Sequence, residues 1–196
     1  MKAVSQLPDG YREIYAIDLQ KNKKLAFWIN ALAILIGVVL AVPMHFVVPF
    51  STLFDMSRGY GAYFARFGVM LAAMIAYMVL HELVHGIAMK LCGTKRVKYG
   101  YTGLYAFAGS EDYYDKAAYI FIALAPVVLW GVVLFVLMLT VPTSWFWVVY
   151  IVQISNLSGA AGDFFVTLRF SRFPKDILVR DSGVSMCVYS CAEEGQ

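Results

Sequence analysis

The sequence predicts an all-α polytopic membrane protein with four transmembrane helices and a small cytosolic β-hairpin or edge strand between the second and third helices. Hydrophobic residues make up 61% of the 196-residue chain, and the mean hydropathy is +0.68. Both values are too apolar for an ordinary soluble domain. Four apolar segments of about 24 residues or more can each cross a hydrocarbon layer about 30 Å thick as a helix. We expect one membrane-embedded domain over residues 1–196.

The chain is expected to begin with a cytosolic arm, residues 1–24. This arm is long and contains acidic residues, unlike the first region of a cleaved signal peptide. Pro43 and Pro126 lie inside the first and third apolar segments, where each is expected to bend a helix. A polar cytosolic tail, residues 169–196, follows the last segment. The four spans are expected at 25–48, 64–92, 117–141 and 145–168.

Several segments outside the spans alternate in a way that is typical of strands. Residues 97–107 alternate basic or small residues with aromatic and branched ones, which indicates the hairpin or edge strand. Shorter strand-like stretches occur in the arm at 11–19 and in the tail near 177–180 and 185–189.

Basic residues are distributed unequally between the two ends of the spans. Two of them, Arg58 and Arg66, lie between the first span and the first residues of the second span, whereas the other fourteen of the sixteen lie in the arm, at the end of the second span and in the loop after it, and in the tail. Because short loops rich in Lys and Arg stay in the cytoplasm, both termini are expected to be cytosolic in a multi-pass protein of the cytoplasmic membrane.

The second span contains the pentapeptide HELVH, from His81 to His85. Residues four apart lie on one face of a helix, so both imidazoles can bind one zinc ion while Glu82 takes a proton from bound water. The alternative is a coincidence of two histidines in a buried helix. We prefer the metal interpretation because ionisable groups inside a span are costly and usually functional. His45, near the end of the first span, is expected to be an interfacial side chain.

A catalytic zinc usually has three protein ligands. Besides Glu82, the only carboxylate inside a predicted span is Asp163, which lies at about the same depth as His85. A buried aspartate is costly unless it is paired or bound to a metal, so Asp163 is the expected third ligand. It could instead bond a hydroxyl group or Arg169. Glu111, in the loop, is the alternative metal ligand.

Asn156 lies on the same helix face as Asp163 and deeper in the span. It could orient a ligand or hold a substrate carbonyl, or it could be a polar contact between helices. The three cysteines form no paired framework, which fits a reducing cytosolic face, and Cys92 is too far from His85 to share a metal. No nucleic-acid-binding patch is present in the sequence.

Five segments carry a resemblance to a known family: LPDGYREIYAIDL, HELVH, ALAPVVL, NLSGAAGD and PKDILVRDSGVSMCVY. Together they resemble a family of small bacterial four-span membrane proteins of unknown function, described as zincin-like metallopeptidases. More distantly, the plan is similar to site-2 proteases, which have HExxH in one transmembrane helix and an Asp in a later one. The resemblance implies zinc on His81, His85 and Asp163, with Glu82 as the catalytic base. Site-2 proteases place Asn-Pro or Leu before the Asp, whereas this chain has Ala161-Gly162.

The sequence therefore predicts a zinc-dependent intramembrane or juxtamembrane metallopeptidase that cleaves membrane-associated polypeptides near the cytosolic leaflet. The expected partners are the lipid bilayer and a membrane-protein or peptide substrate, which could pair with the 97–107 strand. The alternative is a non-enzymatic metal-binding membrane protein, either a carrier or a pseudoprotease scaffold. A hydrolase of lipid amides is a weaker third possibility. Glu82 favours hydrolysis, because a carrier needs no carboxylate at that position.

Overall fold

The computed structural model describes residues 3–103 and 105–191. Parts of the predicted arm, hairpin and tail (residues 1–2, 104 and 192–196) lie outside the described residues. The chain divides into two compact units. Unit 1 consists of Met1–Trp28, Glu82–Pro126 and Asp163–Gln196. Unit 2 consists of Ile29–His81 and Val127–Gly162.

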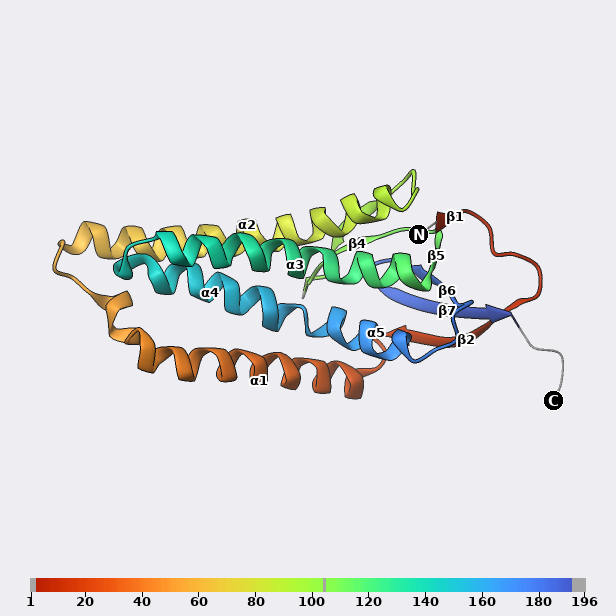
Figure 1. Ribbon diagram of the computed structural model, residues 1–196, viewed down its shortest axis with the longest axis horizontal. Coiled ribbons are helices and arrows are strands. Elements are labelled where there is room, and N and C mark those ends of the chain that lie inside the picture. Colours follow the sequence, from red (N-terminus) through yellow and green to blue (C-terminus); the bar gives the residue numbers. More distant parts are fainter. Residues whose placement is uncertain (1–2, 104, 192–196) are drawn as a thin grey trace. The chain divides into compact units, whose positions relative to one another are not determined.

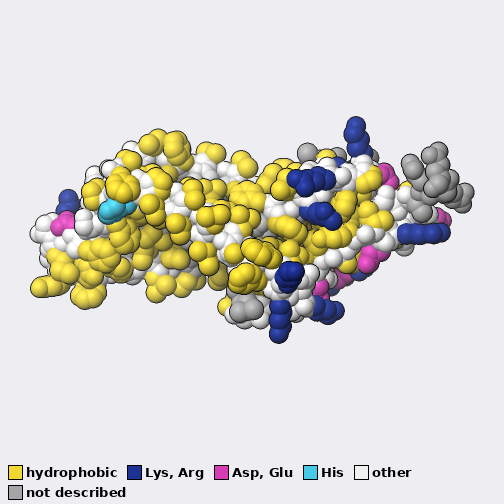
Figure 2. Space-filling view, turned by 90° about the horizontal axis from the view of Figure 1, so that it is seen from below, with side chains coloured by type: hydrophobic (Ala, Val, Ile, Leu, Met, Phe, Trp, Pro, Cys, Tyr) yellow, Lys and Arg dark blue, Asp and Glu magenta, His cyan; other side chains and the backbone are white. Residues whose placement is uncertain are grey.

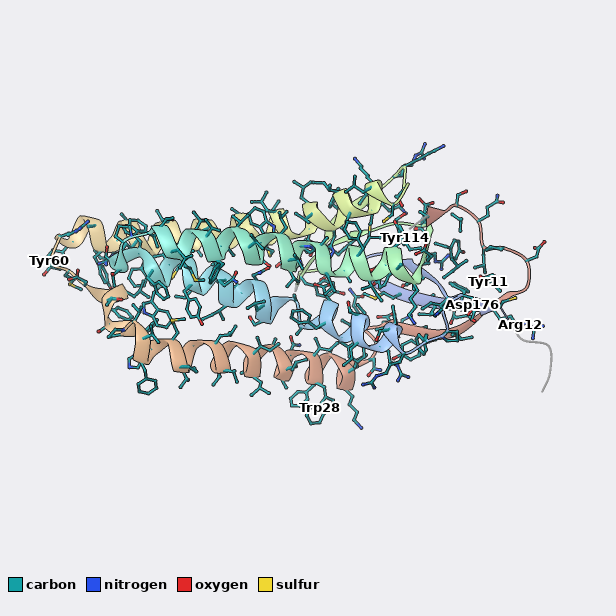
Figure 3. All side chains as sticks on the ribbon, viewed as in Figure 1. Tyr11, Arg12, Trp28, Tyr60, Tyr114 and Asp176 are labelled. Atoms are coloured by element: carbon teal, nitrogen blue, oxygen red, sulfur yellow. The ribbon has the colours of Figure 1, made fainter. Side chains whose placement is uncertain are left out.

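Three long helices dominate the chain (Figure 1): α1 (Lys23–Val47), α2 (Tyr60–Leu91) and α3 (Lys116–Thr140). In the described part of the chain, these three are long enough and apolar enough to cross a membrane. Helix α1 buries none of its residues, and Trp28 projects outward from it with 60% of its surface exposed (Figure 3). Exposed apolar side chains of this kind suit contact with lipid.

The segment predicted as a fourth span, 145–168, is two helices instead of one. Helix α4 (Thr143–Gly159, 17 residues) ends at Ala160, and α5 (Ala161–Ser171, 11 residues) begins directly after it. Gly159 and Gly162, on either side of the break, have low helix propensity. Neither helix alone has the roughly 20 residues that a span requires. The four-span count therefore stays a prediction.

Unit 1 contains a five-stranded antiparallel sheet in the order β1-β5-β6-β7-β2. The fold is therefore mostly helical but not all-α. The alternating stretches of the arm and tail pair with each other, and their long separation in sequence hides that pairing from any local pattern. The strands are β1 (Ala3–Val4), β2 (Tyr11–Asp18), β5 (Tyr113–Asp115), β6 (Leu178–Asp181) and β7 (Ser185–Cys191).

The core of unit 1 forms where this sheet packs against helices. Tyr114, Phe170 from α5, Val179 and Val188 are completely buried there. Strands β2, β6 and β7 lie side by side next to α5 in Figure 1. The edge strand β2 is also tied to the segment before β6, because the Tyr11 hydroxyl donates to the backbone carbonyl of Asp176 at 3.0 Å (Figure 3).

A second, two-stranded sheet pairs β3 (Lys98–Tyr101) with β4 (Ala106–Gly109) in antiparallel register. These strands fall within the alternating 97–107 region and its glycine boundary. They lie between α2 and α3 in the chain and belong to unit 1.

Unit 2 has its own core, formed by the aromatic beginning of α4 and the short 3-10 helix η1 (Phe50–Phe54). Trp147 is buried and donates its indole N–H to the carbonyl of Val48 at 3.1 Å. Arg66, which is 4% exposed, donates to the backbone carbonyls of Thr52 and Ser144 and so ties α2 to η1 and α4. Hydrophobic side chains cover most of the face of unit 2 that is visible in Figure 2.

Candidate metal site

The HELVH motif lies in the last third of α2, whose flanking residues are almost all apolar. His81 is 9% exposed, and the His85 side chain is 12% exposed. Helix α2 is unbroken from Tyr60 to Leu91, so the two imidazoles lie one turn apart on one face of it. The helix itself therefore fixes their relative positions.

His85 is oriented by a backbone carbonyl of α3. Its Nδ1 lies 2.9 Å from the carbonyl oxygen of Ile122. That oxygen would normally accept the N–H of the residue four positions later, which is Pro126 and has no N–H. A carbonyl can only accept, so His85 must carry its proton on Nδ1. The unprotonated nitrogen of a neutral His85 is then Nε2, the atom that can bind a metal.

Asp163 faces that same nitrogen. One of its carboxylate oxygens lies 3.6 Å from Nε2 of His85. The break at Ala160 places Asp163 in the first turn of α5, where the positive end of the helix dipole favours a carboxylate. The sequence expectation of an uninterrupted helix did not include this second reason for an aspartate at the position.

His81 joins these two residues in one group. His81, His85 and Asp163 each offer one ligand atom, and these atoms all lie within 4.8 Å of one another. Nδ1 of His81 lies 2.7 Å from the hydroxyl oxygen of Tyr77, one turn earlier in α2. Each imidazole thus has an outer hydrogen-bond partner on Nδ1, as histidine ligands of metals almost always do.

Glu82 is half-buried within unit 1. The backbone of Ala108, in β4, lies within hydrogen-bonding reach of the Glu82 carboxylate. Strand β3 packs on the next turn of α2. Its Tyr99 hydroxyl lies so close to Gly86 that a side chain at position 86 would collide with it. The small sheet therefore borders the motif, and a glycine directly after His85 permits this close approach.

The other two predicted site residues lie in different surroundings. Glu111 is exposed on the surface of unit 1 and forms an ion pair with Lys98 at 2.8 Å. The hydrogen bond from Lys98 lowers the pKa of Glu111. Asn156 is completely buried in unit 2 and accepts a hydrogen bond from the Tyr77 hydroxyl at 2.9 Å. The structure thus brings Asn156, but not Glu111, to the surroundings of a motif histidine.

Comparison with known proteins identifies the family. Residues 74–178 match the family described as "Putative zincin peptidase". The chain belongs to this family. The matched region contains His81, Glu82, His85 and Asp163, and it confirms the resemblance inferred from the sequence.

One curated relative of this zincin-peptidase family member is the "Uncharacterized 24.7 kDa protein in gap 5'region" of Pyrococcus woesei. It is 31% identical over 118 residues, which are 58% of this chain and 51% of the relative. The chain thus spans about half the length of the curated relative that it matches. No solved structure matches the chain.

The donor set suits the metal after which zincins are named. Two imidazole nitrogens and one carboxylate are a common protein ligand set of catalytic zinc, which keeps one further position open. The outer partners of His81 and His85 occupy Nδ1 in both rings, so the two Nε2 atoms are the ones suited to a metal. The residues therefore fit zinc by type, distance and orientation.

One buried carboxylate near this group was not predicted from the sequence. Asp181, at the end of β6, is 8% exposed and accepts hydrogen bonds from the Tyr119 hydroxyl and the Gly183 N–H, both at 2.8 Å. Burial raises the pKa of Asp181, and the nearby charges of His85 and Asp163 also act on it. The available signal was the Asp-Ser-Gly turn between two strand-like stretches, inside a segment that carried the family resemblance.

Proposed function

We propose that this protein is a zinc-dependent metallopeptidase that cleaves membrane-associated polypeptides near the cytosolic face of a bacterial cytoplasmic membrane. The observation that carries the proposal is the group of ligand atoms from His81, His85 and Asp163, all within 4.8 Å of one another. The two histidines lie on a helix long enough to span a membrane, in a member of a zincin-peptidase family. The adjacent Glu82 supplies the carboxylate that hydrolysis needs.

Each residue has a defined role in this proposal. His81, His85 and Asp163 would hold the metal. Zinc bound there would lower the pKa of a water molecule to about 7 and would polarise the scissile carbonyl. Glu82 accepts a proton from the attacking water and passes it to the leaving amine. Its half-buried position shields the carboxylate partly from bulk solvent.

The small sheet supports an extended polypeptide as the substrate. Within the described residues, β3 and β4 pair only with each other, so the sheet has edges to which a further strand could add. Ala108 of β4 is within reach of the Glu82 carboxylate. A peptide added beside β4 would therefore run close to the proposed base. Because the added peptide would be extended, its carbonyls would be more open to attack than those of a helix, which are hydrogen-bonded within the helix.

Replacing Glu82 with glutamine tests the enzyme proposal most directly. Glu82→Gln keeps the shape of the side chain but loses the basic oxygen. We expect the variant to bind zinc like the parent and to lose proteolysis by about 10²- to 10⁴-fold, the usual contribution of a general base. Substrates can be found by comparing the membrane proteomes of cells that produce the parent or Glu82→Gln. Glu111→Gln, the same change at an exposed position, is the matched control and should cleave like the parent.

The opposite result would favour a carrier or a scaffold. If Glu82→Gln restores every phenotype of a deletion strain as fully as the parent does, catalysis is not what the site provides. If the parent itself holds no zinc after purification in the presence of the metal, the metal site is wrong.

The proposed orientation has its own test. With both termini in the cytosol, as the distribution of basic residues favours, a cysteine introduced at Arg58 should react with a membrane-impermeant reagent added outside. A cysteine introduced at Arg172, in the predicted tail, should react only after the membrane is opened. Labelling of both from the same side would contradict the topology.

A further inference from the structure

We propose that Tyr77 and Asn156 are positioning residues that hold His81 in the tautomer able to bind a metal. The inference rests on the proposed function, because it assigns a role relative to the same histidine. It is carried by a chain of hydrogen bonds within unit 2, which runs from backbone carbonyls of α3 through α4 to the side chain of His81.

The chain begins at two groups that can only accept. The side-chain amide of Gln153 donates to the backbone carbonyl of Gly131 at 3.4 Å. The amide of Asn156 donates to the backbone carbonyl of Val127 at 3.2 Å and also to Gln153 Oε1 at 3.4 Å. A backbone carbonyl has no proton to give, so these contacts determine which atom of each amide is nitrogen.

The direction of the remaining bonds follows. With its nitrogen on Val127, Asn156 turns its oxygen toward Tyr77, and that oxygen needs a donor. The Tyr77 hydroxyl has a single proton, which it donates to the side-chain oxygen of Asn156 at 2.9 Å. The hydroxyl oxygen must therefore accept at its other contact, the 2.7 Å approach to Nδ1 of His81.

Consequently, His81 has its proton on Nδ1. In the neutral ring this leaves the lone pair on Nε2, the nitrogen that the metal group requires. The burial of the chain strengthens the conclusion. Asn156 is 0% and Gln153 is 9% exposed, so water competes poorly for these bonds, and buried polar groups without partners are costly. Tyr77 and Asn156 therefore act on the metal through His81 without touching it.

Two substitutions separate this role from simple packing. Tyr77→Phe keeps the ring but removes the acceptor on Nδ1. Asn156→Leu keeps the Tyr77 hydroxyl but frees its proton, which can then be donated to Nδ1 and force the proton of His81 onto Nε2. We expect each to weaken zinc binding by about 10- to 100-fold, as measured by competition with a chelator. Because both act through one hydrogen-bond chain, the double variant should lose less than the product of the two losses.

The tautomer itself can be observed without metal or activity. In the metal-free protein labelled with ¹⁵N-histidine, the nitrogen shifts of His81 should show protonation at Nδ1. In Asn156→Leu they should show protonation at Nε2, an outcome that lost packing alone does not produce. Tyr150→Phe is the matched control, because it removes another buried hydroxyl of unit 2, which donates to the carbonyl of Leu40 at 2.9 Å. It should leave both the tautomer and the zinc affinity unchanged.

Failure of this inference and failure of the proposed function look different. If the parent binds zinc but Tyr77→Phe and Asn156→Leu bind it equally tightly with an unchanged tautomer, the inference is overturned and the metallopeptidase proposal stands. An equal loss of affinity in Tyr150→Phe also overturns it, since any buried hydroxyl would then matter. If the parent binds no zinc while the tautomer changes as stated, the hydrogen-bond direction is correct and the metal proposal fails.

Discussion

The surroundings of the two motif histidines differ, although the rings lie one turn apart in the same helix. In unit 1, His85 is oriented by the backbone carbonyl of Ile122, which lacks its helical donor because residue 126 is proline. In unit 2, His81 is oriented by the hydroxyl of Tyr77, whose direction depends on Asn156. The comparison shows two ways to fix the same ring nitrogen. One uses a backbone carbonyl that lacks its helical donor because of a proline, and the other uses the side chains of Tyr77 and Asn156.

The largest expected effect concerns Asp163, the third proposed metal ligand beside the two histidines. Asp163→Ala should lower zinc occupancy of the purified protein far below the parent value of about one per chain. Its carboxylate is the one that lies 3.6 Å from Nε2 of His85. Metal analysis of the purified variants measures the loss. Glu111→Ala is the control and should retain zinc, and the reverse pattern would make Glu111 the ligand.

A smaller effect is expected from giving the Ile122 carbonyl, which orients His85, its missing helical donor. Pro126→Ala restores an N–H that competes with the imidazole for the carbonyl of Ile122. Zinc affinity should fall by about tenfold, whereas thermal stability should stay the same or rise, since proline in a helix interior costs about 3 kcal/mol relative to alanine. Pro43→Ala, inside α1, is the control and should leave zinc affinity unchanged. If Pro126→Ala binds zinc as tightly as the parent, the proline does not help to orient His85.

The smallest expected effect concerns the contact of the small sheet with the helix turn after His85. In Gly86→Ala the new methyl group meets Tyr99, and we expect a loss of about 1–3 kcal/mol in the free energy of unfolding, as for an overpacked site. Gly68→Ala, in the same helix with no atom near the new group, should be neutral or slightly stabilising. Unfolding in detergent measures both.

Adding Tyr99→Ala to Gly86→Ala should recover most of that loss, because it removes the group that collides. A loss that persists in the double variant would mean that Gly86 serves the helix itself and not the approach of β3.

Much of the site could be predicted from the sequence because local spacing determines it. The positions of His81 and His85 follow from helical periodicity alone, and an aspartate in an apolar segment stands out by its cost. The orientation of the rings could not be predicted. Pro126 was expected to bend α3, but its effect on the carbonyl of Ile122 depends on which helix packs there. Asn156 was named with several possible roles, and its hydrogen-bond direction depends on α2 and α3.

The sheet shows the same limit in the fold. Alternation marked the stretches that became β2, β6 and β7, but a strand pattern does not name its partner. The pairing of Tyr11 with Cys191 joins a strand near the beginning of the chain to the last described strand. The burial of Asp181 could not be predicted for the same reason. A polar residue is expected in a tail, and only the place of its strand in the sheet shows that this one is buried.

This pairing also determines when the fold can be completed during synthesis. Membrane helices form locally and can do so as they emerge, but β2 (Tyr11–Asp18) has to wait for β7 (Ser185–Cys191) before it gains its partner. Strand β6, which carries Asp181, lies between β5 and β7 and is therefore secured at the same late stage. A nascent chain can thus contain both histidines of the motif long before the surroundings of the motif exist. In a protein proposed to cut polypeptides at a membrane, this order delays a finished site until β7 has been translated.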